Sequence, residues 1–352
     1  MVGVFREVRR VLRDDGTCWV NMGDSYNAGT SAKRKAPQTG VDVGGWQDAE
    51  IDGGARIRVA GLAPKQLLLM PARLALALQA DGWFIRSDII WHKPNPMPES
   101  CRDRPTSAHE HIFLLSKKRT YFYDADAVRE DALPASTERM AAGFNGKDRD
   151  NNYRPGYFVR NGWQSTSRNL RNVWTIATAP YAEAHFATFP PLLAERCIRA
   201  GTSERGCCAA CGAPWVRVTE TTRTKDPTRH TGRAAVGCDD RRDGDWPRMI
   251  AASTTTGWAP SCACGTTTKH FGPFVPAEPV PCTVLDPFSG AGTTALVADR
   301  LGRDAIGIDL SHQYVEMTRE RITADCPLFT SWAPAEDPEE SRMADLFAEA
   351  AE

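Results

Sequence analysis

Residues 284–309, near the C-terminus, have the types and spacing expected of a segment that binds a nucleotide-like ligand. An apolar strand ends at Leu285, and the Ser-Gly-Ala-Gly turn at 289–292 lets the backbone approach a ligand closely. Thr293 then begins a helix whose first N–H groups have no partner inside the helix. Asp309 ends the next apolar strand, where a carboxylate can accept hydrogen bonds from both hydroxyls of a ribose.

Hydrophobic periodicity predicts the elements that position these residues. Residues 284–322 are predicted to form strand, glycine-rich turn, helix, strand and helix, which is a βαβ unit extended by one helix. The glycine spacing alone also fits a simple turn or a dinucleotide site. The third glycine of the G-x-G-x-x-G pattern is absent, which argues against a dinucleotide.

Two cysteine pairs form a second candidate site. One pair has C-x2-C spacing and the other has the tighter C-x-C spacing, and a glycine follows each pair. Four thiolates on two turns can close a tetrahedral zinc site, and they leave no open position for catalysis. The sequence therefore predicts a structural zinc, with unligated thiols on a loop as the alternative. The predicted ligands are Cys208, Cys211, Cys262 and Cys264, with Cys207 and Cys238 as substitutes.

The rest of the chain alternates helical and extended patterns typical of an α/β protein. Three segments read as helices, at residues 2–12, 64–80 and 189–200. Four apolar segments read as strands, at Thr17–Met22, Phe84–Trp91, His111–Ser116 and Tyr121–Tyr123.

The segments between these elements are polar. Residues 30–60 and 130–170 have no sustained hydrophobic period and are predicted to be loops. Residues 202–275 read as an insertion with the cysteine pairs at its ends and an Arg- and Thr-rich middle. The acidic residues 330–352 are predicted to be a frayed helix or a disordered tail.

Composition limits the class of protein. The chain has 352 residues, of which 41% are hydrophobic and 25% charged, with a formal net charge of -1. No segment has the length of a membrane span, and the Arg-containing N-terminus does not read as a signal peptide. Eleven cysteines, an odd number, argue against a disulfide framework. We therefore expect a cytoplasmic protein of a bacterium or a phage-infected cell.

In its full context, the string DPFSGAGTT resembles the S-adenosylmethionine loop of the N4-cytosine and N6-adenine DNA methyltransferases. The resemblance implies that the loop surrounds the cofactor and that Asp309 binds its ribose. The loop residues implied to contact the cofactor are Asp286, Phe288, Ser289, Gly290, Gly292 and Thr293.

The resemblance covers most of the chain. Residues 171–202 resemble the segment that precedes and covers the cofactor loop in this family, and LRDDGTCWVNMGDSYN resembles the strand and loop after the catalytic motif. WHKPNPMPES and HEHIFLLSK resemble later strands of the catalytic half. The order is that of a permuted class, with the cofactor loop last. The resemblance implies an α/β fold with a Rossmann-like, mostly parallel sheet and helices on both faces. It also implies an enzyme that acts on double-stranded DNA within a restriction-modification system of phage or bacterial type.

The family's catalytic tetrapeptide, Ser/Asp-Pro-Pro-Tyr, is absent from the sequence, so no catalytic residue is assigned. The nearest string, Ala179-Pro180-Tyr181, lacks the polar residue, and Phe189-Pro190-Pro191-Leu192 reads as a helix start. The family comparison places the missing strand before Val2. Two explanations remain open: a start codon assigned too far downstream, or a truncated gene. In the missing motif, Ser would favour cytosine and Asp would favour adenine.

These observations predict six regions. They are a catalytic half at 1–128, a polar target-recognition region at 129–171, a cofactor-covering segment at 172–202, a zinc-ribbon insertion at 203–275, the S-adenosylmethionine-binding unit at 276–325 and an acidic tail at 326–352. Two other functions remain as alternatives: a non-catalytic remnant that binds cofactor or DNA, and a small-molecule methyltransferase. A long insertion with basic loops fits a DNA reader better, because a small-molecule enzyme needs no such surface.

Overall fold

The computed structural model describes residues 1–27, 49–52, 56–59, 61–132, 145–147, 153–155, 163–164, 167–179, 188–225, 249–266, 275–276 and 278–326. The chain divides into two units, Met1–Cys282 and Thr283–Glu352. No helix among the described residues is long and apolar enough to cross a bilayer.

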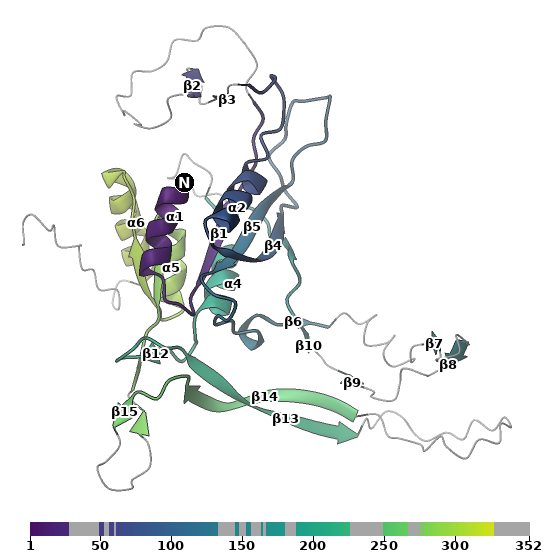
Figure 1. Ribbon diagram of the computed structural model, residues 1–352, viewed down its shortest axis with the longest axis vertical. Coiled ribbons are helices and arrows are strands. Elements are labelled where there is room, and N and C mark those ends of the chain that lie inside the picture. The colour runs from purple at the N-terminus through teal and green to yellow at the C-terminus, as the bar shows by residue number, and fades with distance from the viewer. Residues whose placement is uncertain are drawn as a thin grey trace, which may run out of the picture. The chain divides into compact units, whose positions relative to one another are not determined.

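The first unit is organised around a four-stranded sheet with the order β1-β5-β4-β11 (Figure 1). Its strands are β1 (Thr17–Met22), β5 (His109–Ser116), β4 (Phe84–His92) and β11 (Val173–Thr175). β5 pairs antiparallel with both neighbours, and only β4 and β11 are parallel. The expectation of mostly parallel pairing is therefore wrong for this sheet. No described helix separates β4 from β5, and an antiparallel pair needs no crossover helix.

Helices cover both faces of this sheet, as predicted. Side chains along β5 alternate between two cores, because successive residues of a strand point to opposite faces. Phe113 packs with Phe5 of α1 (Val2–Val11) and with Leu74 of α2 (Met70–Ala80). Ile112 packs on the other face with α4 (Pro191–Gly201) and with Trp174 of β11.

Helix α2 is shorter than predicted, because it begins at Met70 rather than at residue 64. The preceding residues use their backbone groups in pairing with residues 25–27, for example through the Leu68 N–H, which donates to the Ser25 carbonyl at 2.9 Å. Leu68 is 1% exposed, so its apolar side chain is buried without being helical. The Asp24 carboxylate accepts a hydrogen bond from the Met70 N–H at 3.0 Å and so caps the helix that does form.

Two further secondary-structure predictions are wrong. Residues 121–123 form no strand, because the Phe122 N–H donates instead to the Asp15 carbonyl at 2.8 Å. Within the predicted 30–60 loop, β2 (Ala49–Asp52) and β3 (Arg56–Val59) form a hairpin.

The predicted polar region at 129–171 also contains secondary structure. A 3-10 turn, η1 (Asp126–Val128), leads into it. Its short strands are β6 (Glu130–Asp131), β7 (Asn145–Lys147), β8 (Tyr153–Pro155), β9 (Trp163–Gln164) and β10 (Ser167–Arg168). β7 pairs with β8 and β6 with β10, so this region is not the irregular loop that the sequence predicted.

The 203–275 insertion contains a long antiparallel ribbon, β13 (Trp215–Lys225) with β14 (Met249–Pro260). β9 pairs parallel with the start of β14, which joins the ribbon to the 129–171 region. Two smaller pairs complete the segment: β12 (Cys207–Cys208) with β17 (Pro279–Val280), and β15 (Gly265–Thr266) with β16 (Val275–Pro276).

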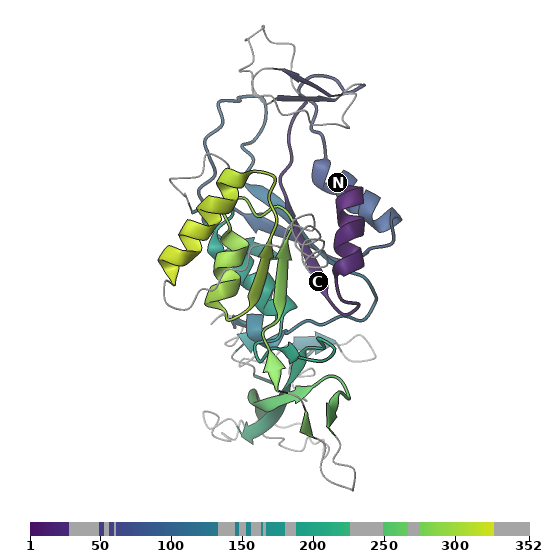
Figure 2. The ribbon, with the colours of Figure 1, turned by 90° about the vertical axis from the view of Figure 1, so that its left-hand side faces the viewer.

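The second unit is the predicted strand, turn, helix, strand and helix. β18 (Thr283–Asp286) pairs parallel with β19 (Asp304–Gly307). α5 (Thr293–Arg300) and α6 (His312–Asp325) lie together on one side of the two strands (Figure 2). Ala295, Leu296 and Ile322 form the core between the two helices.

Candidate cofactor and metal sites

The Asp286 carboxylate shapes the predicted cofactor loop from within. One oxygen accepts a hydrogen bond from the Phe288 N–H at 2.9 Å, and the other accepts from the Thr294 hydroxyl at 2.5 Å. The Ser289 N–H donates to the Ile308 carbonyl at 3.0 Å, which joins the loop to the end of β19. Asp286 therefore fixes the turn into α5.

Asp309 lies just beyond β19 and faces the same loop. Its carboxylate accepts hydrogen bonds from the Gly290 N–H and the Ser311 N–H, each at 2.8 Å. A carboxylate has about four lone-pair sites, so each oxygen keeps a site for a second donor. The side chain is thus held in place with capacity left for two ribose hydroxyls, and it fits the predicted role.

The remaining predicted cofactor residues lie around the same turn. Phe288 is 53% exposed, so its ring is available to a ligand. The Ser289 hydroxyl is buried without a hydrogen-bond partner among the described residues. Thr293 is buried at the first turn of α5, where its hydroxyl lies 3.0 Å from a guanidinium nitrogen of Arg321. Arg321 also donates to the Ala291 carbonyl at 2.8 Å and so secures the turn from α6.

Gly292 has a backbone that only glycine adopts readily, with φ at +70° immediately before α5. A Cβ at this position would lie 2.4 Å from Cγ2 and 2.6 Å from Oγ1 of Thr318 on α6. Thr318 in turn donates its hydroxyl to the Gly290 carbonyl at 3.0 Å. The loop and α6 therefore touch at a point that admits no side chain.

We expect Gly292→Ala to destabilise the second unit by about 2–4 kcal/mol, since it combines a strained φ with an overpacked contact. Gly302→Ala is the matched control, because Gly302 has φ at +67° but nothing within 4 Å of the added Cβ. The measurement is the rate of hydrogen–deuterium exchange of residues 283–326 in both variants. Equal acceleration of exchange in the two would show that the contact with Thr318 contributes nothing.

The four predicted metal ligands converge in the first unit. The Sγ atoms of Cys208, Cys211, Cys262 and Cys264 all lie within 4.8 Å of one another. Zn–S bonds of about 2.3 Å in a tetrahedron place sulfur atoms roughly 3.8 Å apart, so the cluster fits one zinc ion with little adjustment. Cys207 lies outside this cluster, and its thiol donates to the Pro281 carbonyl at 3.4 Å.

The turn holding the first pair is a knuckle with backbone N–H groups directed at sulfur. N–H groups of Cys211 and Ala210 lower the pKa of the Cys208 thiol to about 7. The neighbouring thiols of Cys211 and Cys262 raise the pKa of Cys264 to about 12. A cluster of four thiols cannot easily lose all its protons, because the thiolates repel one another, whereas a divalent cation compensates their charge.

A link between this knuckle and the segment that follows α1 was not predicted from the sequence. Arg13 donates a hydrogen bond to the Cys211 carbonyl and is held by Asp15, with N–O distances of 2.9 and 3.1 Å. Gly212 has φ at +70°, and a Cβ there would lie 2.9 Å from Nη1 of Arg13. No local pattern links residues about 200 positions apart, so only the fold reveals the contact.

A charged cluster at the carboxyl end of β1 was also not predicted from the sequence. Glu110 accepts hydrogen bonds from the Asn21 amide at 2.9 Å and from the Lys93 ammonium group. All three side chains come from different segments of the four-stranded sheet unit. Polar groups at the carboxyl ends of strands line ligand sites in many α/β proteins, but the spacing of these residues in the sequence is uninformative.

The structure brings no catalytic tetrapeptide to either predicted site. Tyr181 and Cys238 lie outside the described residues, as does most of the acidic tail. Within the described part of the chain, β1 is the last strand of its sheet and pairs only with β5, while β18 pairs only with β19. Each unit therefore has a strand with a free edge.

Comparison with known proteins agrees with the cofactor loop. The DNA methylase family matches residues 1–209 and 282–320, which leaves out the ribbon and the second cysteine pair. The Type II methyltransferase M.SmaI of Serratia marcescens is 32% identical over 328 residues, or 92% of this chain and 72% of that protein. M.Cfr9I of Citrobacter freundii is 32% identical over 329 residues, or 92% of this chain and 71% of that protein.

Among solved structures, the chain is similar to the cytosine-N4-specific PvuII DNA methyltransferase. The match has 14% identity and a TM-score of 0.45, and it covers 99% of this chain and 75% of that one. The family match over most of the chain and the curated relatives together establish the assignment. The chain belongs to the DNA methylase family of N6- and N4-methyltransferases, enzymes that transfer a methyl group from S-adenosylmethionine to exocyclic amino groups of DNA bases.

Proposed function

We propose that this chain is the cofactor-binding and DNA-binding part of a site-specific methyltransferase that acts on double-stranded DNA. Asp309, held by two backbone N–H groups beside the glycine turn, is the observation that carries the cofactor assignment. When bound, S-adenosylmethionine supplies the activated methyl group. The loop at 286–293 orients that group, and Asp309 holds the ribose end.

The reaction requires positioning more than acid or base chemistry. An exocyclic amine attacks the methyl carbon directly, so no covalent enzyme intermediate forms, and the base must be turned out of the duplex to reach the cofactor. Since the chain has no Ser/Asp-Pro-Pro-Tyr, we propose that the residues holding the amine come from an additional strand. The edge of β1 that pairs with no described strand offers the backbone groups with which such a strand would pair.

We also propose that the complete fold is Rossmann-like and that the cysteine cluster holds one structural zinc. The geometry of the four sulfur atoms supports the zinc site, and four cysteine ligands leave no position open for a substrate. The zinc would hold together the two ends of the inserted segment, since Cys208 and Cys264 flank the ribbon.

The second candidate is a remnant that binds cofactor or DNA without catalysis. It is favoured by one observation, the absence of the catalytic tetrapeptide from the 352 residues. Both candidates bind cofactor or DNA, so methyl transfer distinguishes them and binding affinity does not.

We expect Asp309→Ala to weaken S-adenosylmethionine binding by about 1–3 kcal/mol, because it removes the acceptor of the ribose hydroxyls and a partner of the Gly290 N–H. Isothermal titration calorimetry measures the change. Asp304→Ala is the control, since Asp304 is an exposed aspartate at the start of β19, the strand that precedes Asp309. Unchanged affinity in Asp309→Ala, or no binding by folded wild-type protein, would refute the assignment.

A further inference from the structure

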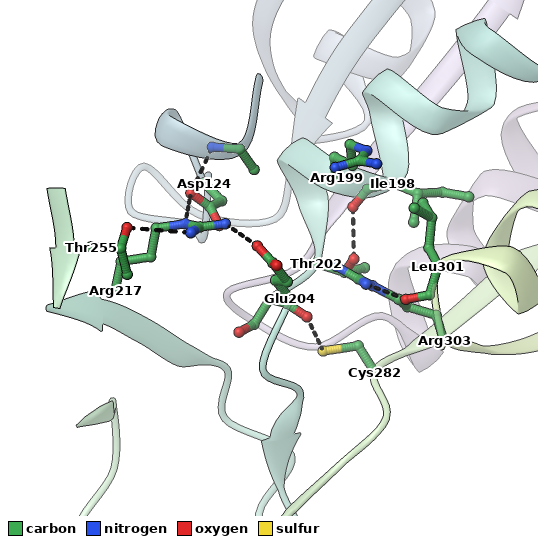
Figure 3. Close-up of polar contacts among 12 residues, drawn as sticks. Asp124, Ile198, Arg199, Thr202, Glu204, Arg217, Thr255, Cys282, Leu301 and Arg303 are labelled. Carbon is green, nitrogen blue, oxygen red and sulfur yellow. Dashed lines mark hydrogen bonds and ion pairs between the residues drawn. The ribbon is translucent and has the colours of Figure 1, made fainter. Parts of the chain in front are cut away.

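The ribbon of β13 and β14 is anchored at its base by one arginine. Nε of Arg217 lies 2.9 and 2.8 Å from the two carboxylate oxygens of Asp124, and a second nitrogen pairs with Glu204 (Figure 3). Asp124 is 4% exposed and Arg217 is 15% exposed on their side chains. Breaking such a partly buried pair leaves an uncompensated charge, so this contact fixes where the ribbon leaves the sheet unit.

Aromatic packing reinforces the same base. The Arg217 guanidinium carbon lies 4.5 Å from the ring centroid of Trp258, its partner on β14. Trp215, two residues earlier, is buried. The Asp124 carboxylate also accepts a hydrogen bond from the Ala127 N–H at 3.1 Å, so it is itself held by η1. The base of the ribbon is therefore fixed on both of its strands.

Beyond the base, the ribbon changes character at a β-bulge. The register shifts between Val218 and Thr219, and the Thr256 hydroxyl there donates to the Val218 carbonyl at 3.2 Å. Residues 219–222 are all exposed, and in the opposite strand only Thr255 of residues 253–256 is partly buried. Every side chain in these two stretches is Thr or Ser except Glu220. This part of the ribbon has no apolar side chain with which to join a core.

Between its base and the end that pairs with β9, the ribbon is two-stranded, and residues 219–222 and 253–256 are largely exposed. A two-stranded ribbon is marginally stable by itself, and these side chains, Thr or Ser except for Glu220, do not suit an apolar partner. The major groove of DNA is about 12 Å wide and admits such a ribbon. Thr and Ser hydroxyls donate to phosphate oxygens and to base edges alike. Arg223 and Lys225 follow in the same strand, where Glu220 is the only acid from Thr219 onward, so the charge favours a polyanion.

We propose that residues 219–222 and 253–256 of the β13–β14 ribbon form a DNA-binding arm that enters a groove of the duplex. Arg217 positions this arm at its base. The inference rests on the proposed action on double-stranded DNA. It moves part of target recognition from the 129–171 region to the insertion, which β9 joins to that region.

The test is fluorescence anisotropy of a labelled, mixed-sequence duplex titrated with the full chain. We expect Thr221→Glu combined with Thr254→Glu to weaken DNA binding by roughly tenfold or more, since two carboxylates would face phosphates. Glu220→Lys should strengthen binding and steepen its salt dependence by about one counterion. The control pair, Ala72→Glu with Gln79→Glu, adds the same charge at exposed positions of α2.

Calorimetry with S-adenosylmethionine on the same proteins separates this inference from the proposed function. Normal cofactor and DNA binding in both double variants would overturn the proposal of a DNA-binding arm and leave the proposed methyltransferase function intact. No DNA binding by wild-type protein would overturn both. A wild-type dimer that Thr221→Glu with Thr254→Glu dissociates, as seen by sedimentation, would show that β13 pairs with a second copy, and it would overturn the DNA assignment of the ribbon.

Discussion

Methyl transfer to DNA is expected to be undetectable with the 352-residue chain and to appear when the chain is extended by a strand that carries Ser/Asp-Pro-Pro-Tyr. Transfer requires the methyl carbon and the amine to be held about 3–3.5 Å apart, with an acceptor for the amine protons. The loop around Asp286 and Asp309 provides the cofactor half of that geometry. The sequence has no Ser/Asp-Pro-Pro-Tyr to hold the amine, and no described strand other than β5 pairs with β1.

The measurement is incorporation of a labelled methyl group into mixed-sequence duplex DNA by both proteins. Asp309→Ala in the extended protein is the control, because it should reduce transfer through cofactor binding alone. Transfer by the 352-residue chain at the rate of the extended one would be evidence against the missing strand. Tyr181, in the nearest string to the motif, would then be the first residue to substitute. No transfer by an extended protein that contains the tetrapeptide and binds cofactor would favour the non-catalytic remnant.

Prediction from the sequence worked best where the determinants are local. The second unit depends on apolar strands, three glycines with positive φ and a helix start within about 40 residues, and all of its elements were predicted. The cysteine pairs were predicted for a related reason, since each pair occupies one turn. The two pairs come together because the strands β13 and β14 between them form an antiparallel hairpin, which returns the chain to its starting point.

Failures occurred where tertiary contacts override local preference. Residues 64–69 carry a helical apolar pattern, yet their N–H and carbonyl groups pair with residues 25–27 and Leu69 takes φ at +54°. The antiparallel direction of β5 depends on which strand it lies beside, and this is not encoded in its own residues. Arg217 read as one more basic residue of a polar insertion, because its partner Asp124 is 93 positions away.

We expect the proposed zinc to keep the inserted segment folded, so that its removal unfolds this segment and leaves the rest of the chain folded. Free energies of about 10–16 kcal/mol for structural zinc at neutral pH exceed what a small segment gains from its own core. Cys208 is 2% exposed, but the other three ligands are accessible at least in part, so chelators can reach the site. We expect about one zinc per chain, and proteolysis within 203–275 should accelerate after chelation.

Cys208→Ser combined with Cys264→Ser should abolish zinc binding and give the same proteolysis pattern without chelator, because it removes one ligand from each knuckle. Cys207→Ser is the matched control: it lies next to Cys208 in the chain, but its thiol donates to the Pro281 carbonyl and lies outside the cluster. Metal analysis of protein purified without added zinc would refute the site if the double variant kept its zinc, or if wild-type protein held none. Loss of zinc in Cys207→Ser alone would show that Cys207, and not Cys208, is a zinc ligand.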